Sequence, residues 1–395
     1  MEATLVIGLG FGDEGKGTIV DYLTRVKKAT TVIKFSGGPQ NAHHVVLPDG
    51  TTHCFSQFGS GTLAGANTYI SKYCYVDPIA LLNEADHLQE LGIQWWERLW
   101  IDAECLLVTP YHIAANVVKE YYRDKKHGSC GRGINETVQY SIDYHNDAPR
   151  VSDMFDYERI QEKLRELQFR KIKEILKYGI DYNNIPEDIK YQVTSLLDKS
   201  SVYKYIDSLR NFEDCVARNT ELSIILSSES VIFEGSQGVL LDQNYEAYFP
   251  HLTRSTTTFQ NALDILAGAR YNGSVEKVAV TRAYMTRHGY GPFKSEVNLD
   301  KKLDIHNEKG TWQGDFRYGI LDLQLLEQSK HYCGGFDYVA LTCVDQIEDF
   351  YGGVVTEEDI VRNLKRYLAP VGIISRGMTW EDKEWVINER EEKIA

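Results

Sequence analysis

A glycine-rich segment near the start of the chain has the residue types of a phosphate-binding loop. It reads LVIGLGFGDEGKGT over residues 5–18, with glycine at positions 8, 10, 12, 15 and 17. The apolar run Leu5–Ile7 predicts a buried strand, and the pattern after residue 18 predicts a helix. Glycines let backbone N–H groups approach a polyphosphate, while the helix N-terminus and Lys16 add positive charge. The segment therefore predicts a nucleotide phosphate site between a strand and a helix.

Asp13 is the residue that a plain phosphate loop does not explain. A carboxylate within an anion site is unfavourable unless it binds a metal ion or accepts a proton. The spacing over residues 10–16 fits a standard phosphate loop, but Gly17 separates the lysine from the hydroxyl of Thr18. A dinucleotide-binding loop would carry glycine where Asp13 stands. Asp13 is therefore the first candidate for catalysis.

Other polar segments also follow apolar runs. The segment 36–44, SGGPQNAHH, brings two histidines that could protonate an oxygen or neutralise a developing phosphate charge. Neighbouring side chains of an extended segment point in opposite directions, so we expect at most one of the two to face a ligand. The segments 129–133 (SCGRG) and 253–258 (TRSTTT) offer hydroxyl and guanidinium groups to phosphate oxygens, although simple turns explain them equally well.

Two strand ends carry side chains that could contact a base. Gln237, in the segment EGSQG after a predicted strand, could present its amide to a base edge or a carbonyl. Asp345 follows the predicted strand 338–342 at the position where guanine-nucleotide proteins hold guanine, but Cys343 stands in place of the usual lysine.

The order of the predicted elements favours an α/β fold with a mainly parallel central sheet. Strands are predicted at 5–7, 31–35, 231–233, 278–283 and 338–342, with a last one at 372–374. A hairpin is predicted around 48–50, a strand at 106–108 and a helix over 77–92. The charged, amphipathic region at about 155–225 predicts a helical insertion within a single large domain, 1–395. Ligands of such sheets bind beyond the carboxyl ends of the strands, where the glycine-rich segments would converge.

The composition narrows the function classes. Of 395 residues, 43% are hydrophobic and 25% charged, which is typical of a globular protein. The net charge of −14 argues against nucleic-acid or anionic-membrane binding, and no apolar run approaches the roughly 18 residues of a membrane helix. The seven cysteines are scattered without a Cys-x-x-Cys pair, and no secretory leader is visible. We therefore expect a cytoplasmic protein with reduced thiols and no membrane or nucleic-acid partner.

In this order, the segments resemble the adenylosuccinate synthetase family, ligases that join L-aspartate to IMP with GTP hydrolysis. The similarity runs from residue 3 to about 382 and is faint from 155 to 225. The segments that match family motifs are Phe11–Thr18, Gly37–Val45, Cys130–Ile134, Phe233–Asp242 and Thr286–Phe293.

The resemblance implies a mechanism. Asp13 would remove the purine N1 proton while the γ-phosphoryl group moves to O6, and the amine of aspartate would then displace the phosphate. His44 stands at the family's histidine and would act as the acid. Lys16 would hold the donor phosphates. Mg²⁺ would be bound by Asp13 and by the backbone at Gly12 and His43, where His43 replaces a family glycine.

The resemblance also implies binding residues and a homodimer. The donor nucleotide, GTP or ATP, would contact Gly12, Glu14, Gly15, Lys16, Gly17, Thr18, Asp345 and Gly377. The purine nucleotide would contact Asp13, Asn41, Ser129, Cys130, Gln237 and Thr253. L-Aspartate would contact Gln313 and Arg317.

Departures from the family pattern leave alternatives open. The arginine-rich aspartate loop of the family is reduced here to WQGDFRYG over residues 312–319, and the arginine lent across the family's dimer has no clear match between 138 and 150. IMP is the favoured acceptor because Asp13 is retained. One alternative is a divergent paralogue that acts on dGMP or a modified purine, or that uses another amino acid. The others are a P-loop NTPase or nucleotide kinase, and a nucleotide-binding protein without catalysis.

Overall fold

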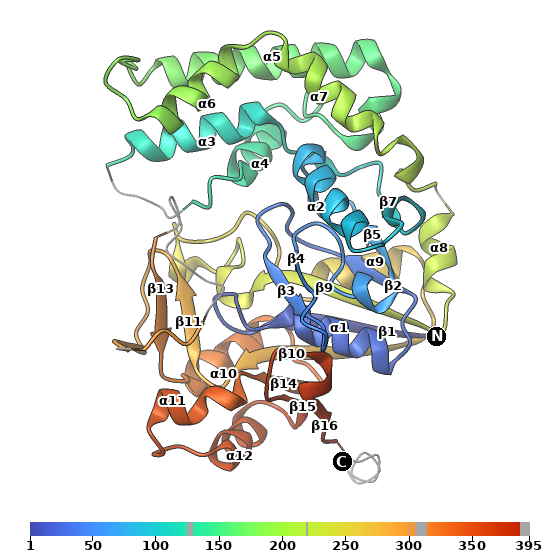
Figure 1. The fold of residues 1–395 in the computed structure, drawn as a ribbon, viewed down its shortest axis with the longest axis vertical. Helices are drawn as coiled ribbons and strands as arrows, with labels where there is room; N and C mark the ends of the chain where they lie inside the picture. The colour runs from blue at the N-terminus through green and yellow to red at the C-terminus, as the bar shows by residue number, and fades with distance from the viewer. Residues whose placement is uncertain (125–128, 219, 300, 305–313, 388–395) are drawn as a thin grey trace.

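A nine-stranded sheet forms the centre of the described part of the protein (Figure 1). The computed structural model describes residues 1–124, 129–218, 220–299, 301–304 and 314–387. Neighbouring strands run parallel except for β16, which is antiparallel to β15. In spatial order the strands are β16 (Lys383–Trp385), β15 (Val371–Ser375), β14 (Tyr338–Thr342), β10 (Ser274–Arg282), β1 (Glu2–Gly8), β9 (Ser230–Gly238), β2 (Thr31–Lys34), β5 (Asn67–Ile70) and β7 (Leu99–Ile101). The predicted mainly parallel sheet is confirmed, but the strand at 372–374 is not the last, because β16 follows it.

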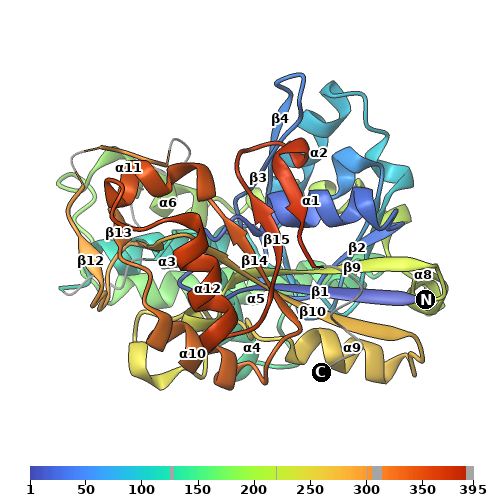
Figure 2. The ribbon, with the colours of Figure 1, turned by 90° about the horizontal axis from the view of Figure 1, so that it is seen from below.

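Helices cover both faces of this sheet (Figure 2). Val6 points to the face covered by α1 (Lys16–Val26), whereas Leu5 and Ile7 point to the face covered by α9 (Gln260–Gly268). All three side chains are fully buried. Burial on both faces explains why these strands read as continuous apolar runs rather than as alternating ones.

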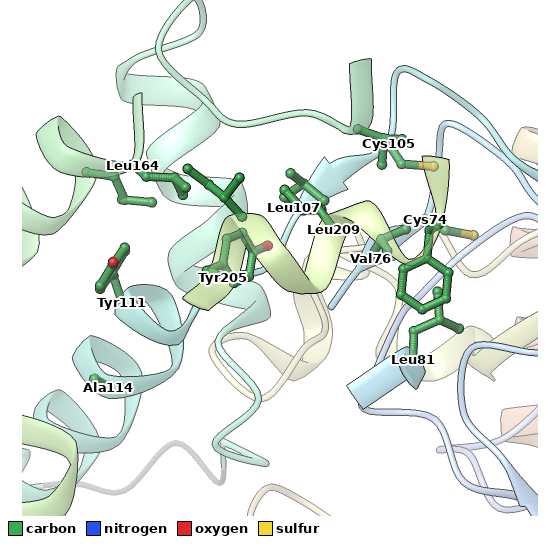
Figure 3. Close-up of a cluster of buried hydrophobic side chains, with 14 of the residues drawn as sticks. Cys74, Val76, Leu81, Cys105, Leu107, Tyr111, Ala114, Leu164, Tyr205 and Leu209 are labelled. Carbon is green, nitrogen blue, oxygen red and sulfur yellow. The ribbon is translucent and has the colours of Figure 1, made fainter. Parts of the chain in front are cut away.

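A layer of helices packs on the β7 end of the sheet. It contains α2 (Pro78–Glu90), α3 (Pro110–Tyr122), α4 (Ile134–Asp143), α5 (Tyr157–Leu176), α6 (Glu187–Leu197) and α7 (Ser201–Arg210), and the chain returns to the sheet through α8 (Glu221–Leu226). Side chains from α3, α5 and α7 share one buried apolar cluster with residues near β5 (Figure 3). The predicted helix at 77–92 is confirmed. The helical layer is larger than the predicted insertion at 155–225, because α3 and α4 pack with α5 and α6.

Smaller elements complete the fold around the main sheet. The predicted hairpin is formed by β3 (His43–Val46) and β4 (Thr52–Phe55), and the predicted strand at 106–108 is β8 (Leu106–Leu107), which pairs with β6 (Tyr75–Val76). A second sheet contains β11 (Met285–His288), β13 (Phe316–Gly319) and β12 (Glu296–Val297). The C-terminal third adds α10 (Leu323–Tyr332), α11 (Ile347–Tyr351) and α12 (Glu357–Tyr367). Within the described ranges, no helix is long and apolar enough to cross a membrane.

Candidate active site

A cavity of about 890 Å³ lies where loops after the sheet strands meet the first turns of α1 and α4. It brings together residues that are far apart in the sequence. The predicted parallel topology had indicated this convergence. The candidate residues in its wall are Gly12, Asp13, Gly15, Lys16, Gly17, Thr18, Asn41, His43, His44, Ser129, Cys130, Gln237, Thr253, Asp345 and Gly377.

Glu14 holds the glycine-rich loop together. Its Oε1 accepts hydrogen bonds from the backbone N–H groups of Gly10 (3.0 Å) and Gly12 (2.8 Å), and Oε2 accepts one from Lys16 Nζ (2.7 Å). Burial would raise the pKa of Glu14, but Lys16 outweighs burial and lowers it. A Cβ at Gly8 would lie 2.1 Å from Oε2 of Glu14, so this position requires glycine. Lys16 and two loop amides are therefore oriented before any ligand binds.

Asp13 is held in the cavity wall by its backbone. Its φ of 60° lies in the left-handed region, which a non-glycine residue rarely adopts. Arg282 Nε donates a hydrogen bond to the Asp13 carbonyl, and Arg282 Nη2 donates one to Asp304 at 2.6 Å. Burial raises the pKa of Asp13 above its ordinary value, against the opposing charge of Arg282. The raised pKa makes this carboxylate a better proton acceptor than an exposed aspartate.

His43 belongs to a buried network. Its Nδ1 lies 2.5 Å from Glu234 Oε1, and its Nε2 lies 3.2 Å from the carbonyl oxygen of Ser236. Both contacts are hydrogen bonds only when the ring carries two protons, whereas burial lowers the pKa of His43. Glu234 also accepts a hydrogen bond from the Ser60 N–H (3.0 Å) and lies 3.6 Å from Lys34 Nζ. The two acceptors orient the ring, and the lowered pKa favours release of a proton from its charged form.

Both histidines are among the residues of the cavity wall, and the expectation that at most one of them faces a ligand stays a prediction. His43 is buried and His44 is partly exposed. The close approach of β3 to the loop depends on Gly17, since a Cβ there would lie 2.7 Å from the Cβ of His43.

Polar side chains line the side of the cavity next to Asp13. Gln237 donates from Nε2 to Oδ1 of Asn41 (3.1 Å) and accepts from the hydroxyl of Ser236 (2.6 Å). Asn41 donates from Nδ2 to the Ser56 carbonyl (3.3 Å). The two amides are thereby oriented against each other. Thr253 and the loop with Ser129 and Cys130 lie in the same wall.

The loops after β14 and β15 also contribute residues to the cavity wall. Thr18 donates to the carbonyl of Met378 (3.1 Å), which connects α1 with the loop after β15. Lys383 fixes the same loop by donating to the carbonyls of Gly377 (3.0 Å) and Thr379 (2.6 Å). Burial lowers the pKa of Lys383 to about 8, against the attraction of neighbouring carboxylates that include Asp345.

Of the two residues predicted to bind aspartate, Arg317 is not among the residues that line the cavity. Arg317 donates from Nη1 to Glu296 (2.8 Å) and from Nη2 to the Gly291 carbonyl (2.8 Å), which holds it on the second sheet. Gln313 lies outside the described residues. The roles of both stay predictions.

Sequence reasoning missed Lys34, Glu234, Arg282 and Lys383 as parts of the site. The available signal was a charged residue at the end of an apolar strand, as in TVIK over 31–34 and VIFE over 231–234. Such residues are buried only when they are paired. Lys383 had no such signal, since its strand was not predicted.

The residues around Asp13 fit a magnesium ion that is shared with substrate. No group of three or more His, Cys, Asp or Glu side chains suited to a metal lies among the residues that the structure describes. Mg²⁺ in nucleotide sites commonly uses one or two carboxylates together with substrate phosphates and water. Asp13, beside Lys16 and the loop amides, provides such a carboxylate.

The comparisons with known proteins agree on one family. A family model described as adenylosuccinate synthetase matches residues 5–354. Adenylosuccinate synthetase of Photobacterium profundum is 33% identical over 374 residues, which cover 91% of this chain and 78% of that protein. The enzyme of Proteus mirabilis is 32% identical over 375 residues, covering 93% and 79%.

Two solved structures share the fold. Fully ligated adenylosuccinate synthetase from Plasmodium falciparum superposes with a TM-score of 0.75 at 18% identity, covering 97% of this chain and 99% of that one. Succinoaminodeoxyadenylate synthetase from cyanophage S-2L, bound to dGMP and dATP as an energy donor, gives a TM-score of 0.67 at 16% identity, covering 99% and 97%. With the sequence matches, they show that this chain belongs to the adenylosuccinate synthetase family of C–N bond-forming ligases.

Proposed function

We propose that this chain joins L-aspartate to C6 of a purine nucleotide, with IMP as the favoured acceptor and a nucleoside triphosphate as the phosphoryl donor. The products would be adenylosuccinate, a nucleoside diphosphate and phosphate. The observation that carries this proposal is the position of Asp13. Its carboxylate borders a cavity that also contains the oriented Lys16 and the paired amides of Asn41 and Gln237.

Asp13 would act as the general base. It would take the N1 proton of the purine, and the electron pair would move to O6, which attacks the γ-phosphorus of the donor. The diphosphate leaves, and O6 carries the phosphoryl group. The amine of aspartate then attacks C6 and phosphate leaves, because phosphate is a far better leaving group than hydroxide. The raised pKa of Asp13 supports this role, since a base of higher pKa removes a proton more readily.

His43 is a second candidate for the acid that stabilises charge on O6 and the phosphate. Glu234 orients its ring, and the lowered pKa of the ring supports proton release. The acid role predicted for His44 stays a prediction. Separate His43→Asn and His44→Asn variants distinguish the two, because the acid is the residue whose loss lowers kcat most.

Mg²⁺ would be held by the Asp13 carboxylate and the backbone at Gly12 and His43, and when bound it supplies charge stabilisation to the donor phosphates. Gly15, Gly17, Thr18 and Glu14 would shape the donor phosphate site. Asp345 and Gly377 would contact the donor base. GTP is the expected donor if Asp345 hydrogen-bonds to guanine, and ATP is the expected donor if it does not.

A dGMP-specific reaction is the second candidate. It is favoured by the fold shared with the phage enzyme that was solved with dGMP. Retention of Asp13, at the position of the family's catalytic aspartate, favours IMP.

One assay tests these proposals. The enzyme is mixed with Mg²⁺, with GTP or ATP, and with IMP or dGMP, in the presence and absence of aspartate. We expect ultraviolet absorbance to change only with aspartate, and the product mass to equal acceptor plus aspartate minus water. Phosphate release without aspartate would instead indicate an NTPase, and transfer of the phosphoryl group to the acceptor without aspartate would indicate a kinase. Size-exclusion chromatography with light scattering tests the proposed homodimer.

A further inference from the structure

Among the described arginine and lysine side chains of the cavity wall, one exposed cation has no carboxylate partner. Lys16 pairs with Glu14 at 2.7 Å, and Arg282 pairs with Asp304 at 2.6 Å. Lys119 and Arg123, which also line the cavity, have carboxylate partners at 2.5–2.7 Å. Arg254 lines the same cavity, and none of the described carboxylates lies within 4.0 Å of it. Its charge is therefore available to an anionic ligand.

Arg287 also lacks a carboxylate partner in the described part of the chain, but it is enclosed. Its guanidinium packs 4.3 Å from the ring centroid of Phe11 and donates to the carbonyls of Tyr290 (3.3 Å) and Pro292 (2.9 Å). Its role is to hold the loop after β11. Arg254, in contrast, is exposed.

Neutral groups hold Arg254 in place. Its Nε donates to Oδ1 of Asn135 (3.0 Å), and its Nη2 donates to Oε1 of Gln139 (3.1 Å), both on α4. Its carbonyl accepts a hydrogen bond from the hydroxyl of Tyr75 (2.7 Å). The guanidinium thus has a fixed orientation while Nη1 keeps its donors for a ligand. A pre-oriented arginine loses little conformational entropy when it binds an oxyanion.

The surroundings of Arg254 also suit an anion. Thr253, which precedes it, presents a hydroxyl-bearing side chain to the cavity, and Ser129 lies in the same wall. The helix α4 begins at Ile134 without a side-chain cap, and Ile134 and Asn135 both line the cavity. The partial positive charge of this helix end adds to that of Arg254.

We propose that Arg254 binds the 5′-phosphate of the purine nucleotide acceptor, with Thr253 beside it. This inference rests on the proposed function. A phosphate dianion matches a guanidinium through two parallel hydrogen bonds. The phosphate would then be bound by side chains of a single chain.

Titration calorimetry with IMP and with inosine, which lacks the phosphate, tests the role of Arg254. Arg254→Met should weaken IMP binding about 10- to 100-fold and leave inosine binding unchanged, because only the charge-assisted hydrogen bonds are lost. Arg254→Lys should give an intermediate affinity. Arg165→Met is the matched control, since Arg165 also lacks a carboxylate partner in the described chain and donates to the hydroxyl of Tyr203 (2.8 Å) outside the cavity.

Three outcomes would overturn the inference. Unchanged IMP binding by Arg254→Met would show that the phosphate lies elsewhere. Equal loss of IMP and inosine would indicate a role in cavity shape. A raised KM for aspartate with unchanged IMP binding would place the amino acid at Arg254. Wild-type protein that binds neither IMP nor dGMP would contradict the proposed function itself.

Discussion

Glu234 is a buried carboxylate that pairs with Lys34 and His43, and the effect of removing its charge can be calculated. The side chain is fully buried and is held by His43, Ser60 and Lys34. Burial alone would raise the pKa of Glu234, but Lys34 and then His43 outweigh burial and lower it from 4.5 to about 2. Glu234→Gln keeps the shape and removes the charge, which leaves the ammonium group of Lys34 buried without its partner.

The lowered pKa sets the size of the effect. Since one pKa unit corresponds to about 1.4 kcal/mol, the ionised carboxylate stabilises the native state by about 3 kcal/mol at pH 7. This agrees with the roughly 3–5 kcal/mol expected when one partner of a buried ion pair is removed. A depressed pKa gives stability that is present above the unfolded value of 4.5 and is lost as the pH falls toward 2. At pH 3.5 the contribution of the charge should have fallen to about 2 kcal/mol.

Urea unfolding followed by tryptophan fluorescence measures this difference. Wild type and Glu234→Gln are compared at pH 7, 5 and 3.5, and we expect a constant difference at pH 7 and 5 and a smaller one at pH 3.5. Glu187→Gln is the control, because the side chain of Glu187 is 87% exposed beside Lys190 and its loss should change stability by less than about 1 kcal/mol. A Glu234→Gln protein as stable as wild type at pH 7, or a difference independent of pH, would refute the reasoning.

The remaining predictions concern activity. Asp13→Ala should abolish turnover while nucleotide binding, measured by calorimetry, stays within about tenfold of wild type, and full activity in this variant would refute the proposed base. Removal of Mg²⁺ with EDTA should abolish turnover and its return should restore it, whereas turnover unaffected by EDTA would exclude a metal requirement. Lys383 loses its proton above about pH 8, and with it the charge that holds the loop after β15. The KM for the donor nucleotide should therefore rise above this pH in wild type. In Lys383→Met this KM should be raised at pH 7 and nearly constant from pH 7 to 9, and a wild-type pH profile in this variant would contradict the role of the charge.

The tertiary structure distinguished residues that the sequence alone could not tell apart. His43 and His44 are neighbours of the same type, and only the position of Glu234, about 190 residues away in the chain, distinguishes them. From the sequence alone, a simple turn explained the segment 253–258 equally well. Its arginine became a candidate phosphate ligand only because hydrogen bonds to α4 hold it at the cavity. The strand β16 was missed because three residues, KEW, give too short a pattern to recognise, and its pairing with β15 is a long-range choice.

The sequence by itself determined the glycine-rich loop between strand and helix, the parallel α/β sheet and the convergence of the polar loops beyond the strand ends. These follow from local patterns, because apolar runs, glycine spacing and the handedness of strand–helix–strand units act over short stretches of chain. Only the tertiary structure decided which charges are neutralised. Whether Lys16, Lys34 or Arg254 has a carboxylate partner depends on side chains that the fold brings within about 4 Å, and Coulomb energies in a desolvated site depend steeply on that distance.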